Sequence, residues 1–420
     1  MKNFVEELRW RGMIHDVTPD TEKYLSNNIT SGYIGFDPTA DSLHIGNLVQ
    51  IMTLVHFQKC GHKPIILIGG ATGMIGDPSG KSKERKFLDL KTISSNQEKI
   101  RLQFEKFLNF SGETAATIVN NNTWFNDFNL LDFLRDVGKH ISVNYMTSKD
   151  SVKNRLETGI SYTEFTYQLI QGYDFYWLWK NKDVKIQLGG SDQWGNILTG
   201  TELIRKIGKD DSYALTTPLI TKTDGGKFGK TEDGNVWLDE KKTSSYKFYQ
   251  FWINVSDDDA INFIKIFSLE NKNKIEKLID LHTKDPHLRI LQNFLADEIT
   301  ILVHGKPNLE IAKKTSKILF GKSEYEDLIK MNEIELESLS SAVSCVTIKR
   351  SNLSNGLTSI LSEDSKNQIF KSKSDVRRMI NNNGLSINKK KIINENYNLS
   401  ENLLLNKFIL LQKGKKHYTF

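Results

Sequence analysis

The stretch Gly32–Leu48, G-Y-I-G-F-D-P-T-A-D-S-L-H-I-G-N-L, has the pattern of a short buried strand that turns into a helix. Tyr33–Phe36 is apolar enough for such a strand, and Asp37–Thr39 ends it, because proline cannot continue a strand ladder. From Ser42 onward, apolar residues recur with helical spacing. The start of a helix presents unpaired N–H groups and a positive dipole end, and phosphate commonly binds there.

Two residues near the expected helix start indicate contact with a ligand. Gly46 is a poor helix former, so we expect a flat group to pack against the backbone at this position. The imidazole of His44 can donate a hydrogen bond to a phosphoryl oxygen. His44 could equally cap the helix or pack locally, so both interpretations stay open at this point.

Length and composition restrict the class of protein. At 420 residues the chain should form two or three domains, and its 38% hydrophobic and 26% charged residues are typical of a soluble globular protein. A net charge of +6 permits a nucleic-acid partner without requiring one. The two cysteines, Cys60 and Cys345, favour a reducing compartment without disulfides. We expect no signal peptide and no membrane-spanning segment, because no apolar run reaches about 18 residues.

Strand patterns alternate with helical patterns along the first half of the chain. Besides Tyr33–Phe36, the expected strands are Lys63–Ile68, Ala116–Asn120, Asp183–Leu188 and Thr216–Thr221. Helices are expected within residues 4–26, at Phe133–His140 and from Ile197. This alternation predicts an α/β fold with a doubly wound, Rossmann-like parallel sheet, whose ligands lie beyond the carboxyl ends of the strands.

A polar face is predicted on the helix that includes Thr163–Asp174. Tyr167, Gln171 and Asp174 are spaced four and three residues apart, so they share one side of that helix. Buried polar groups need partners, which a small polar ligand could supply. The alternative interpretation is a partly exposed polar stripe.

Two lysine-rich segments follow predicted strands. They are K-S-K-E-R-K-F at Lys81–Phe87 and K-T-D-G-G-K-F-G-K-T at Lys222–Thr231. Either could be a mobile clamp on an anionic substrate, or a solvated surface turn. The adjoining G-D-P-S-G-K-S resembles the end of a P-loop, but that motif requires a glycine where Ile75 stands.

The C-terminal part is basic. Helices are expected from Ser244 to about Gly321, followed by a linker. Lys371–Lys391 then carries seven Lys/Arg against one acidic residue, Asp375, in a pattern of helix, glycine stop and hairpin. Such a face in a small terminal domain predicts binding to an RNA backbone and is a weaker match to an anionic membrane. The candidate RNA-binding residues are Lys371, Lys373, Arg377, Arg378, Lys389, Lys390 and Lys391.

Four motifs, in order and with matching spacing, resemble the bacterial tyrosyl-tRNA synthetases, a family within the class I aminoacyl-tRNA synthetases. They are G-F-D-P-T-A-D-S-L-H-I-G from Gly35, G-G-A-T-G-M-I-G-D-P-S-G from Gly69, G-G-S-D-Q-W-G-N-I from Gly189 and K-F-G-K-T from Lys227. The first resembles the "HIGH" signature of the class and the last its "KMSKS" signature. Asn47 replaces the second signature histidine, and Phe228 stands at the methionine position.

The resemblance extends along the whole chain and implies its division into domains. Residues 1–225 would form a Rossmann-like catalytic domain with an inserted connective segment. Residues 226–321 would form a helical domain that begins with the K-F-G-K-T loop, and residues 322–354 a linker. Residues 355–420 would form a small α+β RNA-binding domain.

The resemblance also implies roles for individual residues. Tyr33 and Asp174 would bind the hydroxyl of a tyrosine substrate, Asp77, Tyr167 and Gln171 its amino group, and Gln193 would lie near its carboxylate. Thr39 and His44 would meet the phosphates of ATP, with Asp37 and Asp192 near the amine and the ribose. The other residues implied for the ATP and pyrophosphate site are Gly46, Asn47, Lys81, Arg85, Lys227, Lys230 and Thr231.

The implied activity is tyrosine–tRNA ligation: L-tyrosine and ATP form tyrosyl-adenylate, and the tyrosyl group then passes to the 3′ end of tRNA(Tyr). Mg²⁺ would accompany the ATP phosphates without dedicated protein ligands. The family implies a cytoplasmic homodimer, and Phe133–His140 resembles part of the dimer interface.

Three alternatives remain at this stage. They are a nucleotidyltransferase that acts on another small molecule, a tryptophan-type synthetase, and a non-catalytic RNA-binding descendant of a synthetase. The Tyr33/Asp174 pair disfavours the first two, and the presence of His44 and the site lysines disfavours the third.

Overall fold

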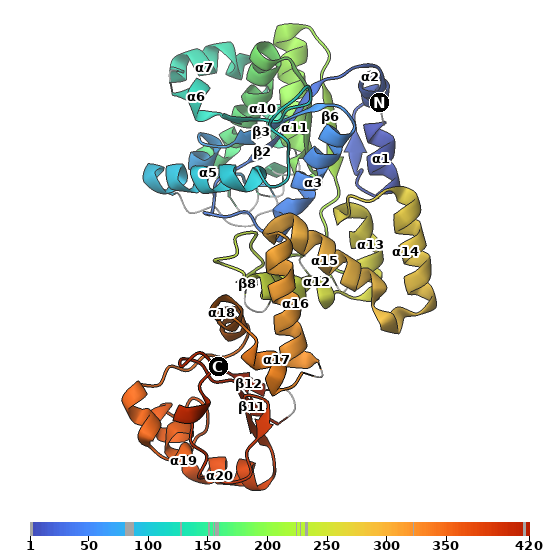
Figure 1. The fold of residues 1–420 in the computed structure, drawn as a ribbon. Coiled ribbons are helices and arrows are strands. Elements are labelled where there is room, and N and C mark those ends of the chain that lie inside the picture. The colour runs from blue at the N-terminus through green and yellow to red at the C-terminus, as the bar shows by residue number, and fades with distance from the viewer. Residues whose placement is uncertain are drawn as a thin grey trace. The chain divides into compact units, whose positions relative to one another are not determined.

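The computed structural model describes residues 3–79, 88–126, 128–149, 152–153, 155, 159–223, 225–226, 228–231, 234–321, 323–414 and 417–420. Contacts divide the chain into two compact units (Figure 1). Unit 1 comprises Met1–Asp239 and Val255–Leu295, and unit 2 comprises Glu240–Asn254 and Ala296–Phe420. Within the described ranges, no helix combines the length and the apolar character that crossing a membrane requires.

Unit 1 is built on a six-stranded sheet, in the order β1-β6-β5-β2-β3-β4. The strands are β1 (Asp16–Val17), β6 (Tyr213–Thr217), β5 (Val184–Gly190), β2 (Ser31–Phe36), β3 (Lys63–Ile68) and β4 (Thr117–Asn120). All neighbouring strands are parallel except β1, which pairs antiparallel with β6 at one edge. The strand order reverses between β2 and β5, so the predicted doubly wound sheet is confirmed, with its switch point there.

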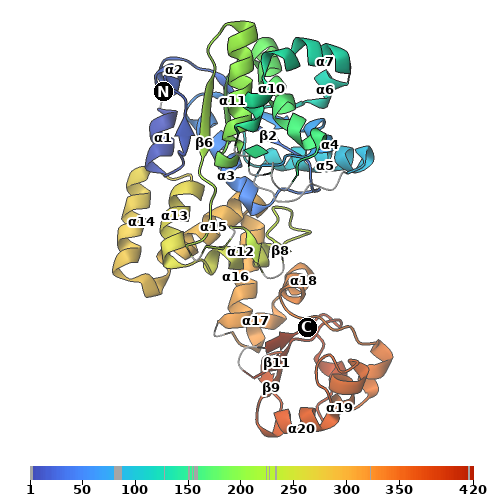
Figure 2. The same ribbon diagram turned by 180° about the vertical axis from the view of Figure 1, so that it is seen from behind.

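Helices cover both faces of this sheet. An added Cβ at Gly32 of β2 would meet Phe57 of α3 on one face, while the ring of Tyr33 packs on Phe175 of α10 on the other. Helices α10 and α11 lie side by side (Figures 1 and 2). The helices of this unit are α1 (Phe4–Trp10), α2 (Thr21–Asn27), α3 (Ile45–Lys59), α4 (Thr72–Ile75), α5 (Leu90–Phe104), α6 (Asn122–Phe125), α7 (Leu130–Asp136), α8 (Val143–Thr147), α10 (Tyr162–Lys182), α11 (Trp194–Leu203), α13 (Asp257–Phe267) and α14 (Lys272–Lys284).

Several predicted boundaries were wrong by a few residues. Helix α3 begins at Ile45 rather than Ser42, because His44 is its N-cap. Strand β6 ends at Thr217, immediately before Pro218, instead of continuing to Thr221. Helix α7 ends at Asp136, and Gly138–His140 forms a separate 3₁₀ turn.

Two further elements of unit 1 differ from the prediction. Helix α11 begins at Trp194 rather than Ile197. The two expected N-terminal helices, α1 and α2, are present, but the strand β1 between them was not predicted. It has only two residues, which is too short for a periodic pattern.

Unit 2 joins helices to a small antiparallel sheet. Its helices are α12 (Ser245–Ile253), the second half of α15 (Ile290–His304), α16 (Lys306–Phe320), α17 (Tyr325–Ile329), α18 (Glu333–Ala342), α19 (Leu357–Ser359) and α20 (Lys373–Asn381). The sheet has the order β10-β9-β11-β12, formed by β10 (Lys390–Lys391), β9 (Leu385–Ile387), β11 (Leu411–Lys413) and β12 (His417–Thr419). The expected helix, glycine stop and hairpin of Lys371–Lys391 are all present.

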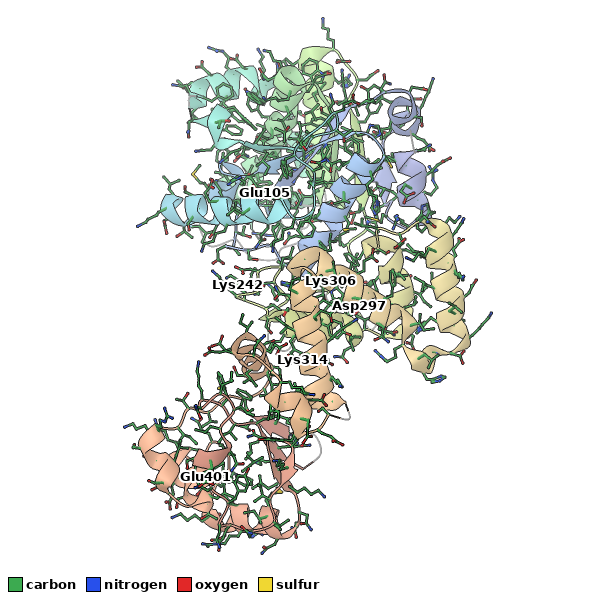
Figure 3. All side chains as sticks on the ribbon, in the orientation of Figure 1. Glu105, Lys242, Asp297, Lys306, Lys314 and Glu401 are labelled. Carbon is green, nitrogen blue, oxygen red and sulfur yellow. The ribbon has the colours of Figure 1, made fainter. Side chains whose placement is uncertain are left out.

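The segment 322–354, expected as a linker of weak periodicity, contains regular structure. Helices α17 and α18 lie within it, and Lys314 of α16 (labelled in Figure 3) forms a 2.7 Å ion pair with Glu335 of α18. Val346, Ile348 and Leu353 pack against the apolar core of residues 355–420, called the C-terminal module below. Both helices are short, so few turns are available to establish a periodic pattern.

Candidate active site

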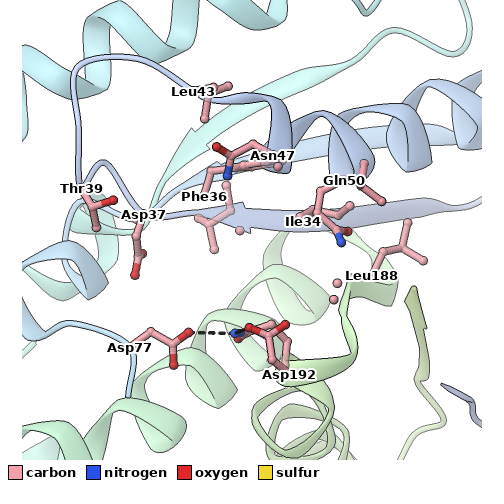
Figure 4. A pocket seen from close by; sticks show the side chains of 18 of the residues that line it. Ile34, Phe36, Asp37, Thr39, Leu43, Asn47, Gln50, Asp77, Leu188 and Asp192 are labelled. Atoms are coloured by element: carbon pink, nitrogen blue, oxygen red, sulfur yellow. Dashed lines mark hydrogen bonds between the residues drawn. The ribbon is translucent and has the colours of Figure 1, made fainter. Parts of the chain in front are cut away.

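A cavity of about 710 Å³ opens at the carboxyl ends of β2 and β5, where the strand order reverses (Figure 4). This is the position where ligands bind in open parallel sheets, and the volume is typical of a small-molecule site. Twelve of the predicted site residues line it: Tyr33, Asp37, Thr39, His44, Gly46, Asn47, Asp77, Tyr167, Gln171, Asp174, Asp192 and Gln193.

The most buried polar groups of the cavity lining are Tyr33 and Asp174. Both side chains are buried, and the Tyr33 hydroxyl has no hydrogen-bond partner among the residues that the structure describes. Asp174 accepts hydrogen bonds from Trp124 Nε1 at 2.9 Å and Asn121 Nδ2 at 3.0 Å. Since an unpaired buried hydroxyl is costly, the arrangement suits a ligand with a polar group at this depth.

Burial also changes the acidity of this pair. Desolvation raises the pKa of Asp174 to about 8, although the hydrogen bonds from Asn121 and Trp124 act in the opposite direction. Desolvation, followed by the nearby Asp174 charge, raises the pKa of the Tyr33 hydroxyl well above 10. Tyr33 is therefore a neutral hydrogen-bond donor at any physiological pH.

A second network joins α10 to the end of β2. The Tyr167 hydroxyl donates to Asp37 Oδ2 at 2.9 Å, and Thr72 Oγ1 donates to Asp37 Oδ1 at 2.6 Å. Asn121 Nδ2 also donates to Thr72 Oγ1, at 3.1 Å, which links this network to the Asp174 carboxylate. These contacts orient polar groups along one wall of the cavity.

The opposite wall carries a third group of polar side chains. Gln193 Nε2 donates to Asp77 Oδ2 at 2.8 Å (the dashed line in Figure 4) and to Asp192 Oδ2 at 3.3 Å. Asn196 Nδ2 contacts Gln193 Oε1 at 3.2 Å and Ser79 Oγ at 3.3 Å. Two carboxylates thus face the cavity, and such groups can bind an ammonium group or a sugar hydroxyl.

At the start of α3, His44 caps its own helix. Its Nδ1 accepts from the Gly46 N–H at 3.0 Å, and Asn47 Oδ1 accepts from the His44 N–H at 3.0 Å. An added Cβ at Gly46 would lie 2.8 Å from the His44 ring. The close approach of this ring explains why position 46 is a glycine. The capping interpretation of His44 is confirmed here, and its Nε2 edge can still reach a ligand.

Gly229 of the K-F-G-K-T motif lies beside this helix start. An added Cβ at Gly229, whose φ is +80°, would meet Ile45 Cγ2 at 2.4 Å. The ring of Phe228 stacks on Phe267 of α13 at 5.4 Å and meets Phe263 edge-on at 4.9 Å. The position that resembles the signature methionine is therefore an apolar anchor on α13.

The predicted cationic clamp is only partly visible. Lys81, Arg85 and Lys227 lie outside the described residues. Lys230 and Thr231 form β7, which pairs with β8 (Gly234–Asn235), and only their backbone is described. The roles of these five residues therefore stay predictions.

The predicted RNA-binding face is less free than the sequence pattern indicates. Lys373, Arg377 and Arg378 pair with Glu363, Glu395 and Asp375 at 2.8, 2.8 and 3.7 Å. Lys389 donates to the Ile318 carbonyl and the Tyr418 hydroxyl, and Lys390 lies 3.5 Å from the centre of the Tyr325 ring. Lys371 and Lys391 are exposed. The hairpin lysines thus also fasten the module to α16 and α17.

Sequence reasoning missed several polar residues of the site. They are Gln50, Thr72, Asn121, Trp124 and Gln187. Asn121 and Trp124 follow the carboxyl end of β4. Because ligands bind beyond the carboxyl ends of parallel strands, this position could have identified them as candidates. Gln187 follows Lys185 by two residues in the strand V-K-I-Q-L, so the sequence did not distinguish it from a solvent-facing polar residue. Gln50 and Thr72 had no distinguishing pattern.

Comparison with known proteins identifies the family of the chain. The model of class I tRNA synthetases (W and Y) matches residues 26–321, and the model of the SYY-like C-terminal domain of tyrosine–tRNA ligase matches residues 335–420. The chain is 55% identical to tyrosine–tRNA ligase of Cytophaga hutchinsonii, over 100% of this chain and 99% of that protein. It is 53% identical to the Flavobacterium psychrophilum ligase, with the same coverage.

Solved structures agree with this assignment. A C-terminally truncated mitochondrial tyrosyl-tRNA synthetase of Aspergillus nidulans superposes with a TM-score of 0.69 at 32% identity, covering 76% of this chain and 95% of that one. A tyrosyl-tRNA synthetase of Archaeoglobus fulgidus, 14% identical with a TM-score of 0.55, shares the fold over 73% of this chain and 99% of its own. The chain belongs to the class I tRNA synthetases of the tryptophan and tyrosine group.

Proposed function

We infer that this protein is a tyrosine–tRNA ligase. It activates L-tyrosine with ATP to tyrosyl-adenylate and pyrophosphate, and then transfers the tyrosyl group to the 3′-terminal adenosine of tRNA(Tyr). Full-length identity to curated ligases supports the activity. The observation that carries the choice of amino acid is the buried Tyr33 hydroxyl beside Asp174, because this pair suits a phenol, whereas phenylalanine would leave the Tyr33 hydroxyl without a partner.

For tyrosine, we propose that Tyr33 and Asp174 bind the hydroxyl. Tyr167, Gln171 and Asp77 bind the amino group, and Gln193 lies near the carboxylate. The Tyr167 and Gln193 contacts to Asp37 and Asp77 support these roles, since they hold the polar groups in place around the cavity.

For ATP, Thr39, His44, Gly46 and Asn47 meet the phosphates at the start of α3. Asp37 and Asp192 lie near the amine and the ribose. Lys81, Arg85, Lys227, Lys230 and Thr231 close on the pyrophosphate. Mg²⁺ arrives with ATP as part of the substrate, and omitting magnesium should abolish adenylate formation.

The chemistry follows from alignment of two substrates. A carboxylate oxygen of tyrosine forms a bond to the α-phosphorus while the bond to the bridging oxygen breaks, and pyrophosphate leaves. A ribose hydroxyl of the tRNA then attacks the carbonyl carbon of the adenylate and AMP leaves. The attacking carboxylate is already an anion, so the protein needs no nucleophile of its own. It positions the substrates and stabilises the developing charge with helix N–H groups and cations.

Each domain has its own role. Residues 1–225 form the catalytic domain, residues 226–321 the helical domain and residues 322–354 the connection. Residues 355–420 bind a distant part of the tRNA with the basic residues of Lys371–Lys391, and a match to an SYY-like C-terminal domain supports this role.

The protein acts as a homodimer in the cytoplasm. Helix α7 exposes Leu130, Leu131 and Leu134, an apolar group that a second copy of the chain would cover. Sedimentation of the purified protein measures the oligomeric state. Cys60 and Cys345 are both free thiols, which suits a reducing compartment, and cell fractionation tests the location.

One assay tests the activity. ATP–pyrophosphate exchange is measured with each of the standard amino acids in turn, in the presence of magnesium. Exchange should depend on tyrosine. Dependence on tryptophan would support the tryptophan-type alternative, and dependence on no amino acid would contradict the proposal.

A further inference from the structure

One buried side chain of the cavity has no role in the site as described above. Gln187 lies in the middle of β5, is 2% exposed and lines the cavity. Its side-chain oxygen has no hydrogen-bond partner among the residues that the structure describes. A buried amide oxygen without a partner is unfavourable, so it requires an explanation.

The surroundings of Gln187 in the sheet offer it no partner. Its neighbours in register are Tyr33 on β2 and Ala214 on β6. On its own strand, Lys185 points to the same face two residues away, but its ammonium group is bound to Asp210 at 2.5 Å. Gly189, two residues in the other direction, has no side chain.

The register places Gln187 beside the predicted hydroxyl site. Paired residues of adjacent parallel strands point to the same face of the sheet and lie about 4.8 Å apart, so the Gln187 amide lies alongside the Tyr33 ring. On the other side of Tyr33, its partner in register is the apolar Ile65 of β3. Of the two residues that flank Tyr33 in register, Gln187 is the polar one.

A phenol oxygen has one hydrogen to donate and can accept two hydrogen bonds. Both carboxylate oxygens of Asp174 are held by Asn121 and Trp124, and Asp174 can still accept the phenol hydrogen. The Tyr33 hydroxyl supplies one donor. The phenol oxygen can accept one further hydrogen bond. The amide of Gln187 can donate it, because a half turn about the terminal side-chain torsion exchanges the positions of N–H and C=O.

We propose that Gln187 is a specificity-determining residue that binds the hydroxyl of the substrate tyrosine together with Tyr33 and Asp174. This assignment rests on the proposed function and extends it to a residue that no sequence motif singled out. In the protein without tyrosine, the unpaired side-chain oxygen of Gln187 costs stability. In the complex, the phenol satisfies it, and phenylalanine cannot.

The test compares Gln187→Met with the unaltered protein. Methionine keeps the length of the side chain and removes both polar atoms. Two quantities are measured: kcat/KM for tyrosine and phenylalanine in pyrophosphate exchange, and the Tm with and without tyrosine. Gln168→Met is the matched control, because Gln168 is also a 2%-exposed glutamine but lies outside the cavity lining, near Met146.

We expect Gln187→Met to lower the tyrosine/phenylalanine ratio of kcat/KM by about tenfold or more, which corresponds to the loss of one well-placed hydrogen bond. The Tm without tyrosine should stay equal or rise, and the increase in Tm caused by tyrosine should shrink. Gln168→Met should leave the ratio unchanged. If the methionine variant does not fold, Gln187→Asn, which withdraws the amide by one methylene, should show the same fall in ratio.

Other results would overturn the assignment. An equal loss for both amino acids would place the amide at the amino or carboxylate end of the substrate. A lower Tm without tyrosine and an unchanged ratio would show a structural role only. Failure of the unaltered protein to show tyrosine-dependent exchange would refute the proposed function instead, so the two failures are distinguishable.

Discussion

The Asp174 carboxylate is the residue on which the choice of amino acid should depend most. It is 1% exposed, and both of its oxygens accept hydrogen bonds from side chains located about 50 residues earlier in the chain. Those donors hold the carboxylate in one orientation. The cavity therefore presents a fixed acceptor at a depth that only an amino acid with a distal hydroxyl can use.

Asp174→Ala should abolish useful discrimination between tyrosine and phenylalanine. The substitution removes the acceptor of Trp124 Nε1 and one of the two acceptors of Asn121 Nδ2, at a cost of about 1–3 kcal/mol for a buried donor left without a partner. The measurement is kcat/KM for both amino acids in pyrophosphate exchange. Asp174→Asn, which keeps the shape and one acceptor, should retain more of the discrimination. An unchanged tyrosine/phenylalanine ratio in the alanine variant would remove Asp174 from the pocket.

A buried histidine far from the cavity should make stability depend on pH. His62 is completely buried between Phe57 and Phe4, and desolvation lowers its pKa to about 4. Between about pH 6.5 and pH 4 the unfolded chain binds a proton that the folded protein does not. Acidification therefore favours unfolding in this window, and the effect levels off below about pH 4.

The free energy of unfolding should fall by about 2 kcal/mol from this residue between pH 7 and pH 5. Urea unfolding of the unaltered protein and of His62→Leu at both pH values isolates the contribution. The variant should lose correspondingly less stability on acidification. An equal fall in the free energy of unfolding of the two proteins would show that His62 is not the titrating group.

Among the elements, α13 packs against Phe228 of the K-F-G-K-T motif through Phe263 and Phe267. The C-terminal end of α13 is bound by Arg11, whose side chain is 1% exposed. The guanidinium donates to the carbonyls of Lys265, Ser268 and Glu270 at 2.6, 2.8 and 2.8 Å and to Glu7 at 2.8 Å. Cations at a helix C-terminus satisfy its unpaired carbonyls and oppose its dipole.

Arg11→Met should destabilise unit 1 by about 3–5 kcal/mol, because it removes a buried guanidinium from three carbonyls and from the partly buried Glu7 carboxylate. Arg9→Met is the control. Arg9 pairs with Glu22 at the surface, where an ion pair contributes about 0–1 kcal/mol. Urea unfolding followed by tryptophan fluorescence measures both. Similar losses in the two variants would contradict the role of Arg11 at the end of α13.

At the scale of the molecule, the complete cavity belongs to unit 1, whereas the basic module belongs to unit 2. The module has its own apolar core, built from residues such as Leu357, Val376, Leu385 and Leu411. Adenylate formation and tRNA binding should therefore be separable.

Deletion of residues from Asn355 onward should preserve tyrosine-dependent pyrophosphate exchange within about twofold and reduce tRNA charging by at least tenfold, through loss of phosphate contacts. Both activities are measured on the same preparation. The difference in tRNA charging between the full-length and the truncated protein should be largest at low ionic strength, where phosphate contacts contribute most, and should shrink as the salt concentration rises. Full charging by the truncated protein would refute the RNA-binding role.

Much of the fold could be read from local patterns. The strand Lys63–Ile68 was predicted at its observed bounds, and the parallel doubly wound sheet followed from the alternation of strands and helices. Such patterns are informative because helical hydrogen bonds and strand alternation depend on neighbouring residues. The four motifs were equally local, and their order sufficed for the family resemblance that the comparisons confirm.

Side-chain partnerships could not be read in this way. Asn121 and Trp124 reach Asp174, and Gln187 lies beside Tyr33, only because the strand order β5-β2-β3-β4 brings distant segments together. The basic residues of α20 were recognisable as charges, but their pairing with Glu363 and Glu395 was not. A hydrogen bond or an ion pair forms within about 4 Å in space, and separation along the chain does not determine that distance.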